Sequence, residues 1–180
     1  WSLAGDSGSK YTAAHGIAVG NFNQRFNKKV SEDLVKTTIN ADVVIEELRG
    51  GSIKTTGISS MDCSDLAING RFTIKPGAIS LMQWNRGDQS KTYGIYMIGS
   101  NNTISITSAD IDDSKNGSLS DLIKTDESLW GGKTEKNVLR IGGGTLKVKE
   151  NQKERYLISA AKGFRTFILS LIHISEPTRR

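Results

Sequence analysis

The chain has 180 residues, of which 36% are hydrophobic and 7% aromatic, with 19 glycines, 2 prolines and a formal net charge of +5. No apolar run reaches the roughly 18 residues of a membrane span, and the glycines and prolines are too few for a collagen-like repeat. The single cysteine, Cys63, excludes an internal disulfide framework and a zinc site with several thiolate ligands. Lysines and arginines are interspersed with acidic residues, which argues against a nucleic-acid-binding surface.

Residues 1–26 are rich in glycine and other small residues, and Ile17-Ala-Val19 is predicted to be a short strand that ends at Gly20. So short a strand needs stacked coils, or several chains wound together, to pair it. The segment His15-Gly-Ile-Ala-Val-Gly-Asn-Phe-Asn23 resembles one unit of the head repeat of trimeric bacterial surface adhesins, which also occurs in phage tail fibres. The resemblance implies that residues 1–26 form a neck of stacked, left-handed parallel β-rolls.

Residues 27–49 are expected to form a helix whose N-cap is Ser31. Apolar residues, with one polar exception, recur at alternating steps of four and three, as in a coiled-coil seam: Val30, Leu34, Thr37, Ala41, Val44 and Leu48. The pattern fits a short trimeric coiled linker and also an ordinary amphipathic helix. A competing interpretation makes Val43-Val-Ile45 a strand, because all three residues are β-branched.

From residue 50 to residue 168 the pattern indicates β structure. Apolar or glycine residues alternate with polar ones over residues 66–74, and apolar segments on both sides of Gly142-Gly-Gly144 predict a hairpin. The expected fold is therefore mainly β, with an antiparallel β-sandwich or β-prism-like domain after the neck and helix. Because apolar residues are sparse, we expect sister copies of the chain to complete the core, as in a homotrimer.

A second resemblance covers the helix and the first β segments. Residues 34–48 with Gly50-Gly-Ser-Ile-Lys54 are similar to linker segments of tail-tip and minor tail proteins of siphophage-like viruses, and residues 66–72 and 93–97 look like the β-modules that follow there. The resemblance implies a structural module of a phage tail fibre or tail tip that supports or performs host-surface receptor binding, without catalysis or a cofactor. It would lie in the virion, contact other tail or baseplate proteins and have a host cell-surface carbohydrate as candidate receptor.

Two alternatives remain open. The first is a head and neck fragment of a trimeric adhesin on the bacterial cell surface. The second follows from Gly5-Asp-Ser-Gly-Ser9, which resembles the nucleophile loop of trypsin-like serine proteases and implies a C-terminal remnant with Ser7 as nucleophile. Against this, Lys10 replaces the usual proline, and Gly16-Ile17 follows too soon for two strands and a turn. A Gly/Ser turn is the favoured interpretation.

Other candidate sites are weaker. Residues 112–121 resemble the start of an EF-hand loop, but Ile123 stands where the bidentate glutamate belongs, which favours a solvated turn without metal. His15 is expected to hydrogen-bond a backbone group rather than to share a metal at a threefold axis, and Cys63 has no partner base in its neighbourhood. Four aromatic residues are candidates for an exposed sugar-binding surface, with core packing as the alternative: Trp84, Tyr93, Tyr96 and Trp130.

The last residues carry a different kind of signal. Leu169-Ser-Leu-Ile-His-Ile-Ser-Glu-Pro-Thr-Arg179 matches the in-frame translation of a common sequencing adapter. We therefore expect residues 169–180 to be an artefact and the chain to be a fragment.

Overall fold

A computed structural model describes residues 13–20, 33–50, 54–81, 91–115, 118–126, 136–149, 156–161, 163–168 and 173–175. These residues form strands joined by short corners, and the described ranges contain no helix. The strands in chain order are β1 (Ala13–Gly20), β2 (Val35–Ile39), β3 (Val43–Ile45), β4 (Leu48–Gly50), β5 (Lys54–Met61), β6 (Ser64–Ile74), β7 (Ile79–Leu81), β8 (Lys91–Ile98), β9 (Thr103–Asp112), β10 (Asp121–Asp126), β11 (Val138–Ile141), β12 (Gly144–Lys147), β13 (Tyr156–Ser159), β14 (Arg165–Ile168) and β15 (His173–Ser175).

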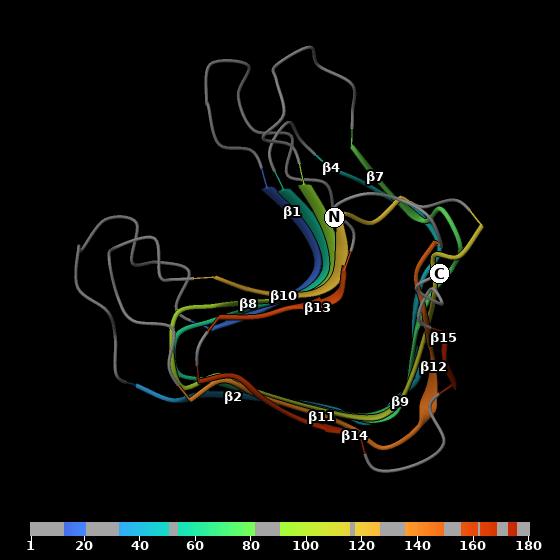
Figure 1. The fold of residues 1–180 in the computed structure, drawn as a ribbon. Helices are drawn as coiled ribbons and strands as arrows, with labels where there is room; N and C mark the ends of the chain where they lie inside the picture. Colours follow the sequence, from blue (N-terminus) through green and yellow to red (C-terminus); the bar gives the residue numbers. More distant parts are fainter. Residues whose placement is uncertain are drawn as a thin grey trace.

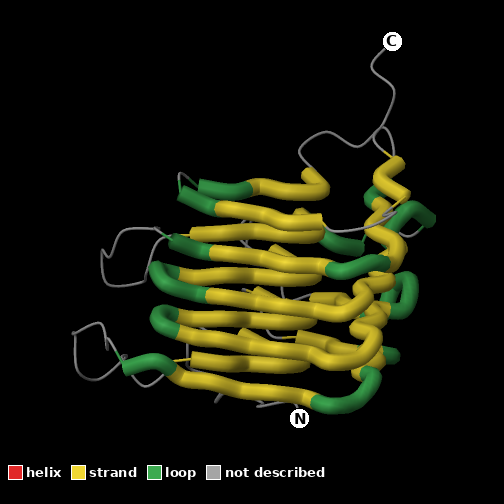
Figure 2. The backbone as a smooth tube through the Cα atoms, turned by 90° about the horizontal axis from the view of Figure 1, so that it is seen from below, coloured by secondary structure: helices red, strands yellow, loops and turns green. Residues whose placement is uncertain are grey.

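Every strand pairing in the described ranges is parallel, and the chain returns to the same position once per turn. Sheet A has the order β1-β5-β8-β10-β13. Sheet B contains β2 and β3 beside β6, then β9, then β11 and β12, then β14 and β15, and sheet C pairs β4 with β7. The fold is a parallel β-solenoid, seen along its axis in Figure 1 and from the side, with its strands in successive layers, in Figure 2.

The core lies between the sheets and is built from columns of like residues. In sheet A, Ile58 pairs with Ile17 on one side and Ile95 on the other, and Ile95 pairs with Ile123. Ile58, Ile95 and Ile123 are each 0% exposed. Full burial of such a side chain contributes about 1.5–3 kcal/mol, so each column is a main source of stability.

Sheet A bends sharply where glycines lie in successive turns, as the curved strands around β1 show (Figure 1). A Cβ atom on Gly57 would lie 2.7 Å from the carbonyl oxygen of Gly94 and 2.7 Å from Cδ1 of Ile74. A Cβ atom on Gly16 would lie 2.8 Å from the carbonyl oxygen of Gly57. The backbones therefore approach too closely for any side chain, which explains glycine at the bend.

Buried amide side chains fix the corner between sheets A and B. Asn137 accepts hydrogen bonds through Oδ1 from the backbone nitrogen and Nδ2 of Asn102, at 3.1 and 3.0 Å. Asn137 also donates from Nδ2 to the Gly99 carbonyl at 2.7 Å, and Asn102 donates to the Ile98 carbonyl at 2.8 Å. The bonds of Asn137 join successive turns and pair the Asn102 backbone nitrogen and the Gly99 carbonyl at the corner.

The structure corrects the predicted fold class. The antiparallel sandwich or prism is wrong, because every pairing between described strands is parallel, and the predicted helix is wrong, because the described part of it forms β2, β3 and β4. The competing interpretation of Val43–Ile45 as a strand is confirmed, as is the short strand at residues 17–19. The hairpin at residues 142–144 is also wrong, because β11 and β12 both pair with β9 and the glycines form a corner between them.

The argument for a homotrimer loses its basis as well. The core columns close within one chain. The predicted neck ends at residue 26 and the predicted helix at residue 49, and the described strands before and after these positions belong to the same solenoid. The homotrimer itself stays a prediction.

The assignment of residues 169–180 to a sequencing adapter also stays a prediction, although His173–Ser175 pairs with β12. Among the described residues, no helix is long and apolar enough to cross a membrane.

Candidate functional site

Sheet A carries a second set of side chains on its outer side, separate from the core. Met61, Tyr93, Tyr96 and Ile98 form a hydrophobic cluster of their own. The bend makes this outer side concave, so that residues before and after the bend approach one another (Figure 1). The rings of Tyr93 and Tyr96 consequently stack, with centroids 4.9 Å apart and an interplanar angle of 23°.

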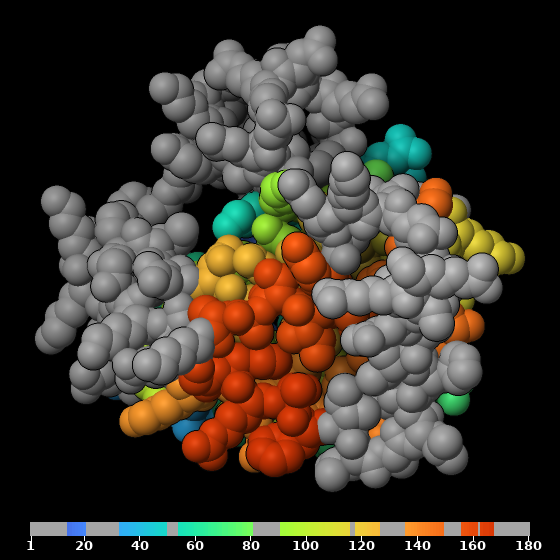
Figure 3. Space-filling model, viewed as in Figure 1, coloured from blue at the N-terminus to red at the C-terminus, as the bar shows by residue number. Residues whose placement is uncertain are grey.

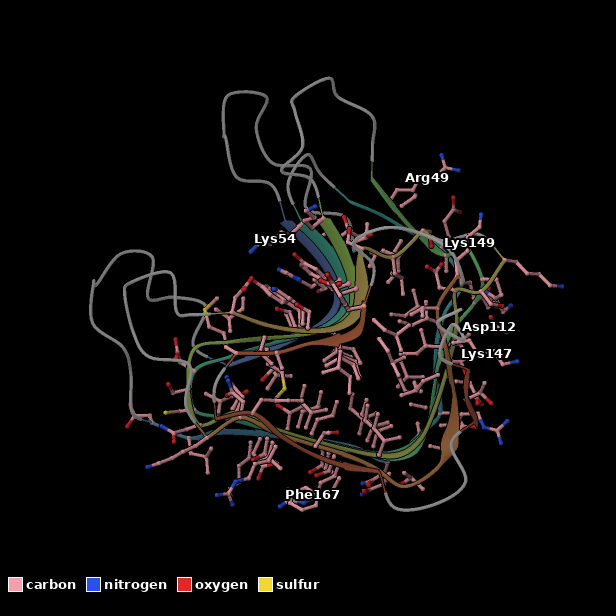
Figure 4. The ribbon with its side chains drawn as sticks, in the orientation of Figure 1. Arg49, Lys54, Asp112, Lys147, Lys149 and Phe167 are labelled. Carbon is pink, nitrogen blue, oxygen red and sulfur yellow. The ribbon has the colours of Figure 1, made fainter. Side chains whose placement is uncertain are left out.

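A polar network surrounds the tyrosine pair. Lys54 donates from Nζ to the Tyr96 hydroxyl at 2.5 Å and lies 4.6 Å from the centroid of the Tyr96 ring. The Tyr96 hydroxyl donates to Oδ2 of Asp126 at 2.9 Å. Figure 4 shows Lys54 on the concave outer side, away from the core. The three residues come from β5, β8 and β10, so parallel stacking brings together groups that are far apart in the sequence.

Lys124 extends the network toward the last turn. Its Nζ lies 3.6 Å from Oδ1 of Asp126 and donates to the Ser159 hydroxyl at 3.1 Å. Lys54 lies 3.8 Å from Oδ2 of the same carboxylate. Asp126 therefore stands between two ammonium groups, whose side chains remain 29% (Lys54) and 25% (Lys124) exposed.

Burial sets the protonation of these groups. It lowers the pKa of Lys54 below its ordinary value, and the neighbouring Asp126 carboxylate opposes that shift. Burial, reinforced by the charge of Asp126, raises the pKa of Tyr93 and Tyr96 far above their ordinary value. Both phenols are therefore protonated at neutral pH and act as hydrogen-bonding groups rather than as bases.

His15 lies on the same outer side, because it pairs with Thr56 and Thr56 with Tyr93. Its Nδ1 lies 2.7 Å from the Thr56 hydroxyl. This hydrogen bond joins two side chains, and the predicted hydrogen bond to a backbone group stays a prediction. Burial, with a smaller contribution from Lys54, lowers the pKa of His15 to about 4, so the ring is neutral at pH 7.

The predicted aromatic platform is not formed by the tyrosines. Tyr93 and Tyr96 are 4% and 1% exposed, so they pack as the alternative interpretation proposed. Trp84 and Trp130 lie outside the described residues, as does Ser7. Among the described residues, Tyr156 presents an exposed aromatic ring on this side: it pairs with Asp121 and is 56% exposed. It lies in the last turn, which faces the viewer in orange to red in Figure 3.

The turn that resembles an EF-hand loop uses its carboxylates internally. Asp112 accepts a hydrogen bond from the Ser114 backbone nitrogen at 3.0 Å. The Asp113 carboxylate accepts from the backbone nitrogens of Ser118 and Leu119 at 2.8 and 2.9 Å. In the part of the chain that the structure describes, no three His, Cys, Asp or Glu residues are grouped to hold a metal, and Cys63 is buried. This turn is a structural element of the solenoid.

Sequence reasoning missed Lys54, Lys124 and Asp126. Lys54 lies in β5, whereas Lys124 and Asp126 lie two positions apart in β10, so no local motif joins all three residues. The sequence feature that could have indicated the site is the dipeptide Gly-Ile, which recurs at residues 16–17, 57–58 and 94–95. Aligning the three dipeptides gives the register of the turns, and this register shows which flanking residues lie side by side.

Comparison with protein-family models, curated proteins and solved structures gave no match for this chain.

Proposed function

We propose that this chain is a non-catalytic structural module of a phage tail fibre or tail tip that supports or performs host-surface receptor binding, with the outer side of sheet A as the contact face. The observation that carries the proposal is the network of Lys54, Tyr96, Asp126 and Lys124. These groups lie outside the main core cluster and link successive turns on the outer side of sheet A. The side chains of Lys54 and Lys124 are partly exposed, and polar groups held rigidly in this way are suited to recognition of a hydrophilic receptor.

The solenoid suits a mechanical role. Each turn contacts mainly the turns beside it, so the module resists bending and presents equivalent positions along one axis. A linear receptor such as a surface polysaccharide can then contact several turns at once. Weak contacts repeated along the module, or among sister copies if the fibre is a homotrimer, combine through effective concentration.

The alternative of a trimeric adhesin fragment agrees with the structure in one respect. β1 stacks in parallel on β5, as the β-roll resemblance implies. However, the stacked residues His15 and Thr56 are 41 positions apart, whereas the resemblance rests on a short local unit. The neighbouring genes distinguish the two proposals, because tail-assembly and lysis genes beside this reading frame contradict a bacterial adhesin.

The function is tested by binding of the full chain to immobilised bacterial surface polysaccharides, measured on a biosensor. We expect at least one polysaccharide to bind and Tyr156→Ala to weaken that binding, because the ring is exposed on the proposed contact face. Phe167→Ala is the matched control, since its ring is 43% exposed on sheet B beside Arg140. Equal losses in the two variants, or no binding at all, contradict the proposal.

A further inference from the structure

The charges on the outer side of sheet A are unequal. Lys54 pairs with Lys91, and both precede the bend. Lys124 pairs with Tyr96, and Asp121 pairs with Tyr93. Among the described residues, the columns therefore place three lysines and two aspartates, Asp121 and Asp126, on this side. Within the described ranges, these lysines outnumber the aspartates by one.

The surplus charge is concentrated around Asp126. One carboxylate serves two ammonium groups, at 3.8 Å from Lys54 and 3.6 Å from Lys124. Both distances exceed the roughly 2.7–2.9 Å of a direct charge-assisted hydrogen bond. Among the described residues, the direct hydrogen bonds of these lysines go instead to neutral groups, the Tyr96 and Ser159 hydroxyls. An ammonium group has three donors, so both lysines retain the capacity to bind another anion.

We propose that this site, formed by Lys54, Lys124 and the Tyr156 ring, binds an anionic polysaccharide. An anionic group of the polymer contacts the exposed sides of the two ammonium groups, beside Asp126, and a neighbouring sugar ring contacts the exposed face of Tyr156. The inference rests on the proposed function and specifies its ligand: a carboxylate or phosphate polymer rather than a neutral one. Charge complementarity carries the choice, because the lysines are partly exposed and share one carboxylate.

The test measures binding of the full chain to polysialic acid, to its carboxyl-reduced neutral form and to polyglycerol phosphate. We expect one or both anionic polymers to bind, with affinity that falls as salt rises, and the neutral form to bind weakly. Lys54→Gln and Lys124→Gln each reduce affinity about three- to tenfold, as expected for a partly exposed ion pair. Lys75→Gln is the matched control, because Lys75 pairs with the exposed Glu46 outside sheet A.

Asp126→Asn separates recognition from a merely structural role. Removing the competing carboxylate is expected to raise affinity for the anionic polymer, whereas damage to the fold lowers it. Lys54→Arg keeps the charge and is expected to retain binding. The inference is overturned if the neutral polymer binds equally well, if the two glutamine variants bind like Lys75→Gln, or if Asp126→Asn does not gain affinity. Binding of neutral polysaccharides that depends on Tyr156 leaves the proposed function standing while this inference fails, and absence of all binding refutes both.

Discussion

Ile95→Ala tests whether the core closes within one chain. Ile95 is 0% exposed and lies between Ile58 and Ile123 in the central turns of sheet A. The substitution removes three carbon atoms at about 0.8 kcal/mol each, or about 2.4 kcal/mol of lost transfer free energy. A cavity flanked by fixed turns relaxes poorly, so the total loss should reach about 3–4 kcal/mol.

Urea denaturation followed by circular dichroism measures this loss. Val44→Ala is the control, because Val44 is a β-branched strand residue that is 50% exposed, and it should change the free energy of unfolding by only about 0.5 kcal/mol. For a core closed within one chain, the unfolding midpoints of wild type and variant are independent of protein concentration. For a core completed by sister copies, both midpoints rise with concentration. A rising midpoint, or equal losses in the two variants, refutes the reasoning.

The remaining predictions concern the bend, the corner, an unpaired hydroxyl and acid stability. Gly57→Ala should destabilise the chain by about 1–3 kcal/mol in the same denaturation assay, because its Cβ meets backbone. Asn137→Ala should cost about 2–3 kcal/mol, because it leaves buried partners unpaired. Ser59→Ala should keep or raise the thermal midpoint, because the buried Ser59 hydroxyl has no hydrogen-bonding partner. The lowered pKa of His15 means that the unfolded chain binds more protons than the folded chain between pH 6.5 and about pH 4. The free energy of unfolding should therefore decrease as the pH is lowered through that window, and should decrease less in His15→Gln. An unchanged midpoint in either of the first two variants, a lower midpoint in Ser59→Ala or an identical pH profile in His15→Gln contradicts the corresponding argument.

The β character of the chain was predictable, whereas the direction of pairing was not. Alternation over residues 66–74 marks a strand with one buried side, and β6 has that pattern. Parallel and antiparallel neighbours impose the same alternation, so the pattern alone cannot distinguish them. The number of residues per turn is also not constant, so the sequence shows no regular repeat. Hydrogen-bonded residues of successive turns are 35 positions apart for Asn102 and Asn137, but only 28 for Thr92 and Ser120.

The mispredicted helix shows two periodicities competing in one segment. Steps of four and three fit a heptad, but Val35, Thr37 and Ile39 also alternate with more exposed neighbours, as β2 requires. A polar corner then interrupts the segment, where Asn40 accepts a hydrogen bond from Asn69 and Asp42 accepts one from the backbone of Arg71. These partners belong to the next turn, so only the tertiary structure decides between helix and strand.

The candidate site was out of reach for a related reason. The site forms only when parallel strands stack, because stacking is what brings Lys54, Tyr96 and Asp126 within hydrogen-bonding distance. Within its own strand, none of the three residues belongs to a recognisable motif. The sequence left Tyr96 open between an exposed aromatic surface and core packing, and the bend turns it against Tyr93 and buries both. Composition indicates that aromatic and charged residues exist, but the glycine bend determines which of them meet.

The low hydrophobic content led to the expectation of sister chains, and the interior of the solenoid shows why that step fails. Part of the interior is polar but internally paired: Ser60 contacts Ser64 at 2.5 Å, and Ser64 donates to Asn102 at 2.8 Å. Buried polar groups that pair with one another across turns fill space without the cost of unpaired burial. Each apolar column is covered by the equivalent residues of the turns on either side, so a narrow core suffices. Any association of sister copies must therefore be sought at the surface of the solenoid, and light scattering on the full chain measures it independently of the fold.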